Sequence, residues 1–189
     1  MIFRKKTYNV IECDNIFIRL PQRRDYIEWR HLRDKNYESL KNWEPDGTSL
    51  NLSYQNFKSR VWWANKGFEE KKVLSMLIFK KSDQALMGSI TLENIIRKPF
   101  YSSNLGYWMG QEYRRLGYMS CAIECLLQFA DNNWGITKFY AATLGENTPS
   151  ISLLKKLNFC EEGKLLKYLK INGVWRDHLL FSHISVNRQ

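Results

Sequence analysis

The chain has 189 residues, of which 44% are hydrophobic and 25% charged, a composition that fits one globular domain and excludes a fibrous or disordered protein. Its formal net charge is +10: residues 1–99 hold 19 basic and 12 acidic side chains, and residues 100–189 hold 10 and 7. Such a surplus favours an anionic partner (nucleic acid, an acidic membrane surface or a phosphate-bearing cofactor) and disfavours polycations. A solvated basic surface explains the same charge.

No segment has the pattern of a membrane anchor or an export signal. The chain lacks a run of roughly 18–20 apolar residues, and the basic start Met1–Lys6 is not followed by an apolar core. We therefore expect a cytoplasmic protein. The cysteines, Cys13, Cys121, Cys125 and Cys160, show neither metal-ligand nor redox-pair spacing, which predicts buried thiols and no metal site.

Hydrophobic periodicity and turn residues divide the first half of the chain into helices followed by strands. The predicted elements are a strand over 16–20, helices over 24–33 and 36–43, a loop over 42–49, a helix from about 53 to 67, and a hairpin of strands 73–79 and 86–96. In the long helix, Phe57, Val61, Trp62 and Phe68 are expected to form the apolar face.

The second half alternates strands and helices before a closing hairpin. The predicted elements are a strand over 104–109, a helix over 119–134, a strand over 138–144, a helix over about 148–158, and two strands flanking a type I′ turn at Asn172-Gly173. Gly106 predicts a bulge or a close approach to the backbone. The order predicts one mixed α/β, α+β-like domain over 1–189, with its core over about 16–184.

A basic turn precedes the helix at 119–134. Over residues 114–120 it reads Arg-Arg-Leu-Gly-Tyr-Met-Ser, so it places two guanidinium groups beside a helix N-terminus, an arrangement that binds phosphate. An ordinary basic loop has the same composition, and the sequence is neither a Rossmann fingerprint nor a P-loop. At the next strand-to-helix junction, Asn147 and Ser150 offer an amide and a hydroxyl, for a ligand or for helix capping.

Together these segments resemble the GNAT acetyltransferases along nearly the whole chain. In that family an Arg/Gln-x-x-Gly-x-Gly/Ala turn and its helix bind acetyl-coenzyme A; the turn at 114–119 is similar, with Met119 in place of the small residue. The family's second signature resembles the segment from Asn147 to Phe159, where Asn158 replaces the usual Gly, and Glu-Gly follows at 162–163.

This resemblance implies a single GNAT-type domain with a central, twisted, mostly antiparallel sheet of about seven strands flanked by helices. It implies that the strand at 104–109 splays away from the one at 138–144, helped by Gly106, so that the pantetheine of acetyl-CoA lies along the exposed edge. The cofactor-binding residues that it implies are Trp108, Met109, Arg114, Arg115, Leu116, Gly117, Tyr118, Met119, Ser120, Asn147 and Lys155.

The resemblance also implies direct attack of an amine on the thioester, without a covalent enzyme intermediate. An amide near Met109 would polarise the thioester carbonyl, Asn147 would hold the pantetheine, and Ser150 would donate a proton to the departing thiolate. Glu93 is our candidate for the base; an exposed carboxylate at a strand end accounts for it equally well.

Within the family, three stretches resemble the ribosomal-protein-alanine N-acetyltransferases: residues 40–45, 105–111 and 172–178. The likeness implies that the acceptor is the N-terminal alanine of a ribosomal protein, with small-subunit protein S5 as the specific expectation. Residues expected to line the acceptor cleft are Trp43, Glu44, Trp175, Arg176 and Asp177, although both tryptophans could instead serve packing.

Two other functions stay open. A small-amine acetyltransferase acting on a polyamine or aminoglycoside shares the same cofactor half, but cationic acceptors call for a carboxylate-rich cleft. A ribosome- or RNA-associated assembly factor would use the basic N-terminal half, and Arg23, Arg24, Arg30 and Arg33 are the candidates for contact with ribosomal RNA. Either a monomer or a homodimer is expected.

Overall fold

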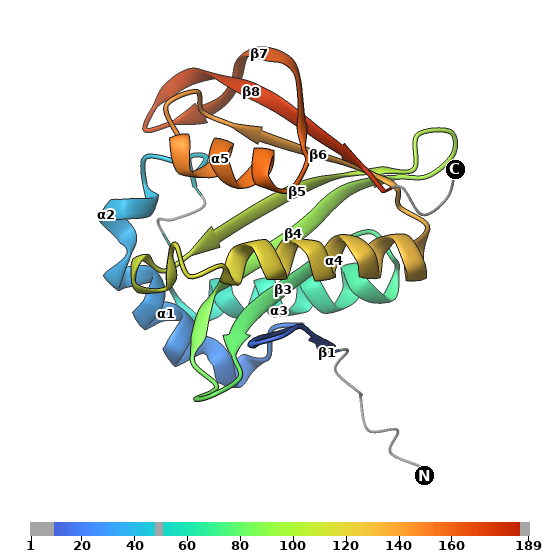
Figure 1. Cartoon of the computed structure of the whole chain (residues 1–189). Coiled ribbons are helices and arrows are strands. Elements are labelled where there is room, and N and C mark those ends of the chain that lie inside the picture. Colours follow the sequence, from blue (N-terminus) through green and yellow to red (C-terminus); the bar gives the residue numbers. More distant parts are fainter. Residues whose placement is uncertain (1–9, 48–50, 186–189) are drawn as a thin grey trace.

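An eight-stranded sheet runs through the computed structural model, which describes residues 10–47 and 51–185 (Figure 1). Its strands are β1 (Val10–Glu12), β2 (Ile16–Arg19), β3 (Leu74–Lys80), β4 (Leu86–Ile96), β5 (Ser102–Met109), β6 (Lys138–Thr143), β7 (Cys160–Ile171) and β8 (Val174–Ile184). Their order across the sheet is β1-β2-β3-β4-β5-β6-β8-β7, and only the pair β5–β6 is parallel. The mixed, mostly antiparallel sheet is confirmed. It has one strand more than expected because β1 has only three residues, too few to show alternation.

In the described part of the chain, five α-helices and two short 3₁₀ turns accompany the sheet. They are η1 (Arg23–Asp25), α1 (Tyr26–Lys35), α2 (Tyr37–Leu40), α3 (Tyr54–Glu69), η2 (Gln111–Tyr113), α4 (Tyr118–Trp134) and α5 (Thr148–Lys156). Local signals fix their ends: the Ser53 side chain accepts a hydrogen bond from the Asn56 amide at the start of α3, and Gly135, at φ +66°, ends α4 in the left-handed conformation. None of the described helices combines the length and apolar character needed to cross a membrane.

Each face of the sheet carries its own hydrophobic core. On one face, side chains of α4 and α5 such as Ile123 and Leu154 pack against alternate strand residues, for example Ile78 of β3. On the other face, α1 and α3 pack against the intervening strand residues, for example Leu77 of β3. Period-two alternation in β3 therefore serves both cores, and the sheet lies between α4 and α5 on one face and α1 and α3 on the other (Figure 1). The two sets meet at the end of α3, where Phe68 packs against Phe129 and Trp134 of α4.

One residue of the expected apolar face of α3 lies outside it. Phe57 is buried and Val61 packs beside it, as expected for residues four apart on a helix, whereas Trp62 is 62% exposed. One further residue rotates the side chain by about 100° around the helix axis, away from the sheet. The Lys66 ammonium lies over the indole ring of Trp62 instead, 4.8 Å from its centroid.

Of the two expectations for Gly106, the bulge is wrong, and a close approach of a ligand to its backbone stays a prediction. The β4–β5 ladder runs without interruption through the pair Thr91–Gly106, and its irregularity lies between Glu93 and Ile96. The splay of β5 from β6 is nevertheless present, because these strands pair only over Ser102–Asn104 of β5. The remainder of β5 therefore has a partner on the β4 side alone.

Candidate active site

The turn before α4 presents an anion-binding helix N-terminus. Gly117 caps the helix at φ +83°, and Arg115 also has a positive φ, +63°. In an α-helix the first amides have no acceptor within the helix, so the amides of residues 118–120 face the turn together with the positive end of a 17-residue helix dipole. This geometry favours a phosphate group at residues 117–120.

The side chains around this turn divide into inward and outward groups. Arg114 turns inward, where its Nε donates to the Met109 carbonyl oxygen at 3.0 Å and its guanidinium reaches Ser39 at 3.3 Å. Arg115 and Leu116 are exposed, and Met119 is buried in the core on the α4 face. Arg114 therefore braces the turn against β5, and Arg115 is the guanidinium open to a ligand.

The exposed edge of β5 offers backbone groups to a ligand. The Gly110 amide donates to the Met87 carbonyl oxygen at 2.9 Å, which makes Met109 and Gly88 a non-hydrogen-bonded pair. The amide and carbonyl of Met109 consequently point away from β4, toward the space left by the diverging β6. By the same alternation, Leu105 and Tyr107 direct their amides to this edge, where an extended ligand can pair as a half-strand.

A hydrogen bond between side chains spans the gap between the two splayed parts of the sheet. The hydroxyl groups of Tyr107 on β5 and Ser150 on α5 lie 2.8 Å apart. Burial raises the pKa of Tyr107 to about 12, so the phenol stays protonated at neutral pH. Sequence reasoning identified Ser150 and missed Tyr107, because no local motif links a tyrosine on one strand with a helix more than 40 residues later.

Asn147 acts as the N-cap of α5. Its side-chain oxygen accepts a hydrogen bond from the Ser150 amide at 3.3 Å, which was the structural alternative raised for this residue. The side-chain NH₂ group of this half-buried residue is not used in that bond, so the cap leaves it available for a ligand amide. Lys155 is exposed near the far end of the same helix, about 7–8 Å along the axis from Ser150.

The two segments expected to line an acceptor cleft meet in space. The Asp46 amide donates to the Lys170 carbonyl oxygen at 2.9 Å, the Gly173 amide donates to the Asp46 carboxylate at 3.1 Å, and the Asn172 and Asn42 side chains are bonded at 3.1 Å. Residues 42–46 thus rest on the turn of the β7–β8 hairpin, whose type I′ geometry follows from positive φ at Asn172 and Gly173.

Charged residues at this cleft are paired with neighbours. The carboxylate of Glu44, whose side chain is 14% exposed, makes a bidentate pair with Arg33 at 2.5 and 2.6 Å. Arg176 pairs with Glu146, and Asp177 accepts from Lys164 at 2.8 Å, which lowers the pKa of the Asp177 carboxyl group. Glu44 therefore acts as a buried partner of Arg33.

Aromatic side chains remain open to solvent on the same side of the molecule. Trp175 is 58% exposed and Trp43 37%. A concavity of about 470 Å³ is lined by the hairpin residues 174–179 together with Gly145, Glu146 and Lys164. Since Glu146 directly precedes the cap of α5, the concavity borders the helix end that carries Ser150.

Two predicted site residues lie on the other face of the sheet from Ser150. Glu93 is exposed on β4 and pairs with Asn104, and by strand alternation it faces the side covered by α1 and α3. The Trp108 ring faces the same side, where the Arg33 guanidinium stacks over it at 4.8 Å. The structure therefore does not bring Glu93 together with Ser150, and Trp108 offers only its backbone to the exposed edge of β5.

The cysteines are not all buried as expected. Cys13 is buried, Cys121 and Cys125 are partly exposed, and Cys160 is exposed at the start of β7. Burial predicted from composition fails for Cys160 because it occupies the outward position of a strand at the edge of the sheet.

Comparison with known proteins gives concordant matches. The model of the acetyltransferase (GNAT) domain matches residues 15–160. The [ribosomal protein uS5]-alanine N-acetyltransferase of Escherichia coli strain K12 is 27% identical over 170 residues, which are 90% of this chain and 88% of that protein. The crystal structure of ribosomal-protein-S5-alanine acetyltransferase from Vibrio fischeri superposes with a TM-score of 0.87 at 25% identity, covering 96% of this chain and 99% of that one.

A further solved structure shares the fold and contains a coenzyme A derivative. RimJ of Mycobacterium smegmatis, in complex with CoA-disulfide, has a TM-score of 0.84 at 24% identity, covering 94% of this chain and 87% of that one.

Proposed function

Because the chain belongs to the acetyltransferase (GNAT) domain family, and is therefore an acetyl-CoA-dependent N-acetyltransferase, we propose that its acceptor is the N-terminal α-amine of a ribosomal protein. The alanine N-terminus of an S5-like protein is the specific acceptor in this proposal. The observation that carries it is the joining of residues 42–46 to the β7–β8 turn, which leaves Trp43 and Trp175 exposed beside the end of α5.

The cofactor occupies the exposed edge of β5 and the N-terminus of α4. Its pyrophosphate accepts hydrogen bonds from the amides of residues 117–120, and Arg115 supplies a nearby positive charge. The pantetheine arm pairs with the free backbone groups of Leu105 and Tyr107. Because the N-terminus of α4 lies at the Met109 end of β5, where Arg114 donates to the Met109 carbonyl oxygen, the arm runs from Met109 toward Leu105. The thioester then lies near Tyr107 and Ser150, so a free β5 amide on that side of Met109, and not the expected Met109 amide, polarises the carbonyl oxygen.

Transfer proceeds by direct attack of the amine on the thioester carbonyl carbon. A C–N bond forms, the C–S bond breaks, and the nitrogen loses a proton while the sulfur gains one. Ser150 donates that proton to the thiolate, and the Tyr107 hydroxyl, 2.8 Å away, returns a proton to Ser150. The raised pKa of Tyr107, about 12, keeps this donor loaded at neutral pH.

An α-amine makes a modest demand for a general base. Its reference pKa is roughly 7.7–8.0, against about 10.4 for lysine, so at pH 7 about a tenth or more of it is already neutral. A water molecule can take the proton, and Glu93 remains our candidate residue for that step. Glu93 lies on the face covered by α1 and α3, whereas the proposed acceptor cleft borders the end of α5 that carries Ser150, so this geometry favours the water molecule over Glu93 for the step.

Charge pairing disfavours a polyamine or aminoglycoside as the acceptor. The carboxylates that line the concavity, Glu146 and Asp177, are each paired with a basic side chain, Arg176 and Lys164, that lines the same concavity. A polycation would have to displace these partners to find a negative charge.

A basic groove supports docking on ribosomal RNA. A depression of about 1000 Å³ between η1 and α3 is lined by four basic side chains (Arg23, Arg24, Lys58 and Lys66), by the exposed Trp62 and by two acidic side chains (Glu69 and Glu70). Lysine and arginine side chains contact phosphates, and an exposed indole ring can stack on a base.

Of the four arginines expected to contact ribosomal RNA, one does not lie on the surface. Arg30 is exposed, as Arg23 and Arg24 are, but Arg33 is buried against Glu44 and cannot contact RNA.

Mass spectrometry of ribosomal proteins tests the proposal. Small subunits that lack N-terminal acetylation are incubated with the enzyme and labelled acetyl-CoA, with spermidine present as a competing acceptor. Label on the N-terminal alanine of an S5-like protein is expected. Label on spermidine alone would overturn the assignment, and label on other ribosomal N-termini would keep the class of acceptor while overturning S5.

Binding to ribosomal RNA at increasing salt tests the groove separately. Replacing Arg23 and Arg24 by Gln should weaken binding and flatten its salt dependence by about one unit of slope for each lost phosphate contact. Acetylation of an isolated peptide should be unchanged, and loss of that activity would contradict a pure docking role.

A further inference from the structure

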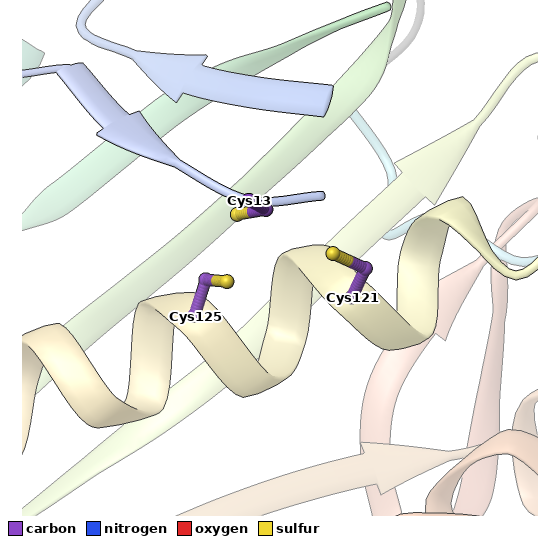
Figure 2. A group of neighbouring side chains, drawn as sticks. All are labelled: Cys13, Cys121 and Cys125. Atoms are coloured by element: carbon purple, nitrogen blue, oxygen red, sulfur yellow. The ribbon is translucent and has the colours of Figure 1, made fainter. Parts of the chain in front are cut away.

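Three cysteine side chains that lie far apart in the sequence converge at one place. Cys121 and Cys125 are four residues apart on α4 and so share one face of the helix, and Cys13 lies in the turn between β1 and β2 (Figure 2). Their sulfur atoms all lie within 4.8 Å of one another. Cys121 directly follows the turn at 117–120, but no step of the acetyl transfer described above uses any of the three thiols.

The turn that carries Cys13 is held in place by the fold. The Cys13 amide donates to the Ile16 carbonyl oxygen at 3.0 Å, and β1 and β2 pair in antiparallel register across it. Cys13 belongs to the core on the α4 face, against which Cys121 and Cys125 also pack. The three sulfur atoms are thus presented by two elements whose relative position is already set, which lowers the conformational cost of a shared ligand.

We propose that Cys13, Cys121 and Cys125 form a three-sulfur binding site for a soft, thiophilic metal ion. Zinc–sulfur bonds are about 2.3 Å long, and sulfur atoms around one such ion lie roughly 4 Å apart. The present spacing is within a small side-chain rotation of that value. Thiolate ligands select Cu(I) and Zn(II) and their soft analogues over Mg(II) or Ca(II).

Binding of an ion releases protons from the site, because the thiolate and not the thiol is the metal ligand. Binding of a divalent ion M²⁺ to three thiols gives an M(SR)₃ centre of charge −1 and releases three protons. Affinity therefore rises with pH, which is a signature that a site made of carboxylates lacks in this range.

The three-cysteine cluster is accessible to a small ion and can surround it. Cys121 and Cys125 are partly exposed, so an ion can reach the cluster from solvent, whereas Cys13 closes it on the inner side. Among the described residues, no His, Asp or Glu ligand atom joins the three sulfur atoms within the same spacing. The site is therefore three-coordinate in protein ligands and leaves one position to a water molecule.

Metal titration of the full-length, reduced protein under anaerobic conditions tests the site. Cd(II) is the probe because its thiolate complexes absorb in the ultraviolet, and Zn(II) is then added in competition. We expect one ion per chain, thiolate-to-metal charge-transfer absorption, and release of about three protons per ion in weakly buffered solution. Absence of binding, or binding without charge-transfer absorption, would overturn the proposal.

Single substitutions assign the ligands. Cys13→Ala, Cys121→Ala and Cys125→Ala should each weaken Cd(II) binding by more than about a hundredfold, since loss of an outer-shell partner alone costs about 10–100-fold. Cys160→Ala, which removes the fourth and exposed cysteine, is the matched control and should bind as the parent does. Equal weakening in all four variants, or none in the first three, would contradict the site.

Folding of the variants is checked before the titration is interpreted. Cys125→Ser, at a partly exposed position, supplies a second variant in case Cys13→Ala unfolds. With folded variants, the parent protein should gain several degrees in Tm on adding Zn(II), and Cys125→Ser should gain none, because an ion that binds only the native state stabilises it. An equal gain in both proteins would count against the site.

Discussion

The proposed cofactor side and the proposed acceptor side of the molecule are built in different ways. The cofactor side uses backbone groups that regular geometry leaves unpaired: the first amides of α4 and the edge of β5 beyond its short pairing with β6. The acceptor side uses side chains from segments more than 120 residues apart, and most of its charged groups already bind one another. A binding surface made of backbone depends on glycine and on strand register, whereas one made of side chains depends on the whole fold.

The largest effect is expected for the buried ion pair of Arg33 and Glu44 on the acceptor side. Glu44→Ala leaves the Arg33 guanidinium buried without its partner, so the free energy of unfolding should fall by about 3–5 kcal/mol, measured by urea denaturation. Glu38→Ala, which removes an exposed pair with Lys41, is the control and should change it by less than about 1 kcal/mol. Equal effects of the two substitutions would show that the acceptor loop does not depend on its buried pair.

Ser150, the proposed proton donor, should show a loss of turnover without a loss of affinity when it is replaced. Ser150→Ala should lower kcat about a hundredfold or more and leave the KM for acetyl-CoA unchanged, because the amide of residue 150, which Asn147 caps, is retained. Ser152→Ala on the same helix, at an exposed position, should match the parent. An unchanged kcat in Ser150→Ala would remove the residue from the reaction.

The dependence of the cofactor side on backbone conformation can be separated from helix stability. Gly117→Val forces a β-branched residue into a left-handed conformation at about 1–2 kcal/mol, and should weaken coenzyme A binding roughly tenfold, measured by calorimetry. Gly135→Val imposes the same kind of strain at the other end of α4 and should lower Tm without changing that affinity. Equal loss of affinity in both variants would mean that helix stability, and not the turn, sets binding.

The smallest expected effect is the dependence of the rate on pH. For a peptide acceptor, kcat/KM should rise about 6–11-fold from pH 7 to a plateau as the α-amine, with a reference pKa of roughly 7.7–8.0, loses its proton. No fall should follow up to pH 10, because the pKa of Tyr107 is raised to about 12 and its hydroxyl remains a donor. A fall beginning below pH 9 would show that a different group supplies the proton.

Local sequence signals predicted the fold better than they predicted its side-chain contacts. Gly135, the Asn172-Gly173 turn and the apolar repeat of α4 each act within a few residues, and the structure places these elements as expected. Strand β1, which the sequence did not predict, and Trp62, which was expected on the apolar face, show the limit of such signals. Three residues are too few to show a period, and one step along a helix decides whether a side chain is buried.

The candidate site was predictable where the chain itself supplies the geometry. The turn at 114–120 forms its geometry within one contiguous segment, whereas the partner of Ser150 is Tyr107, 43 residues away. The same holds for Arg33, which appeared to be a surface charge until Glu44 was brought against it. Contacts of this kind arise from tertiary packing, so no characteristic spacing in the sequence predicts them.

The contact between residues 42–46 and the β7–β8 turn also sets an order of events during translation. Asp46 leaves the ribosome long before Gly173, to which it is bonded across 127 positions. At about 5–20 residues per second, the acceptor loop waits roughly 6–25 s for its support, while the strand and helices of the cofactor side are being completed. The segments of the proposed cofactor site are therefore synthesised first, and a nascent chain cannot present a finished acceptor cleft until its C-terminal hairpin has emerged.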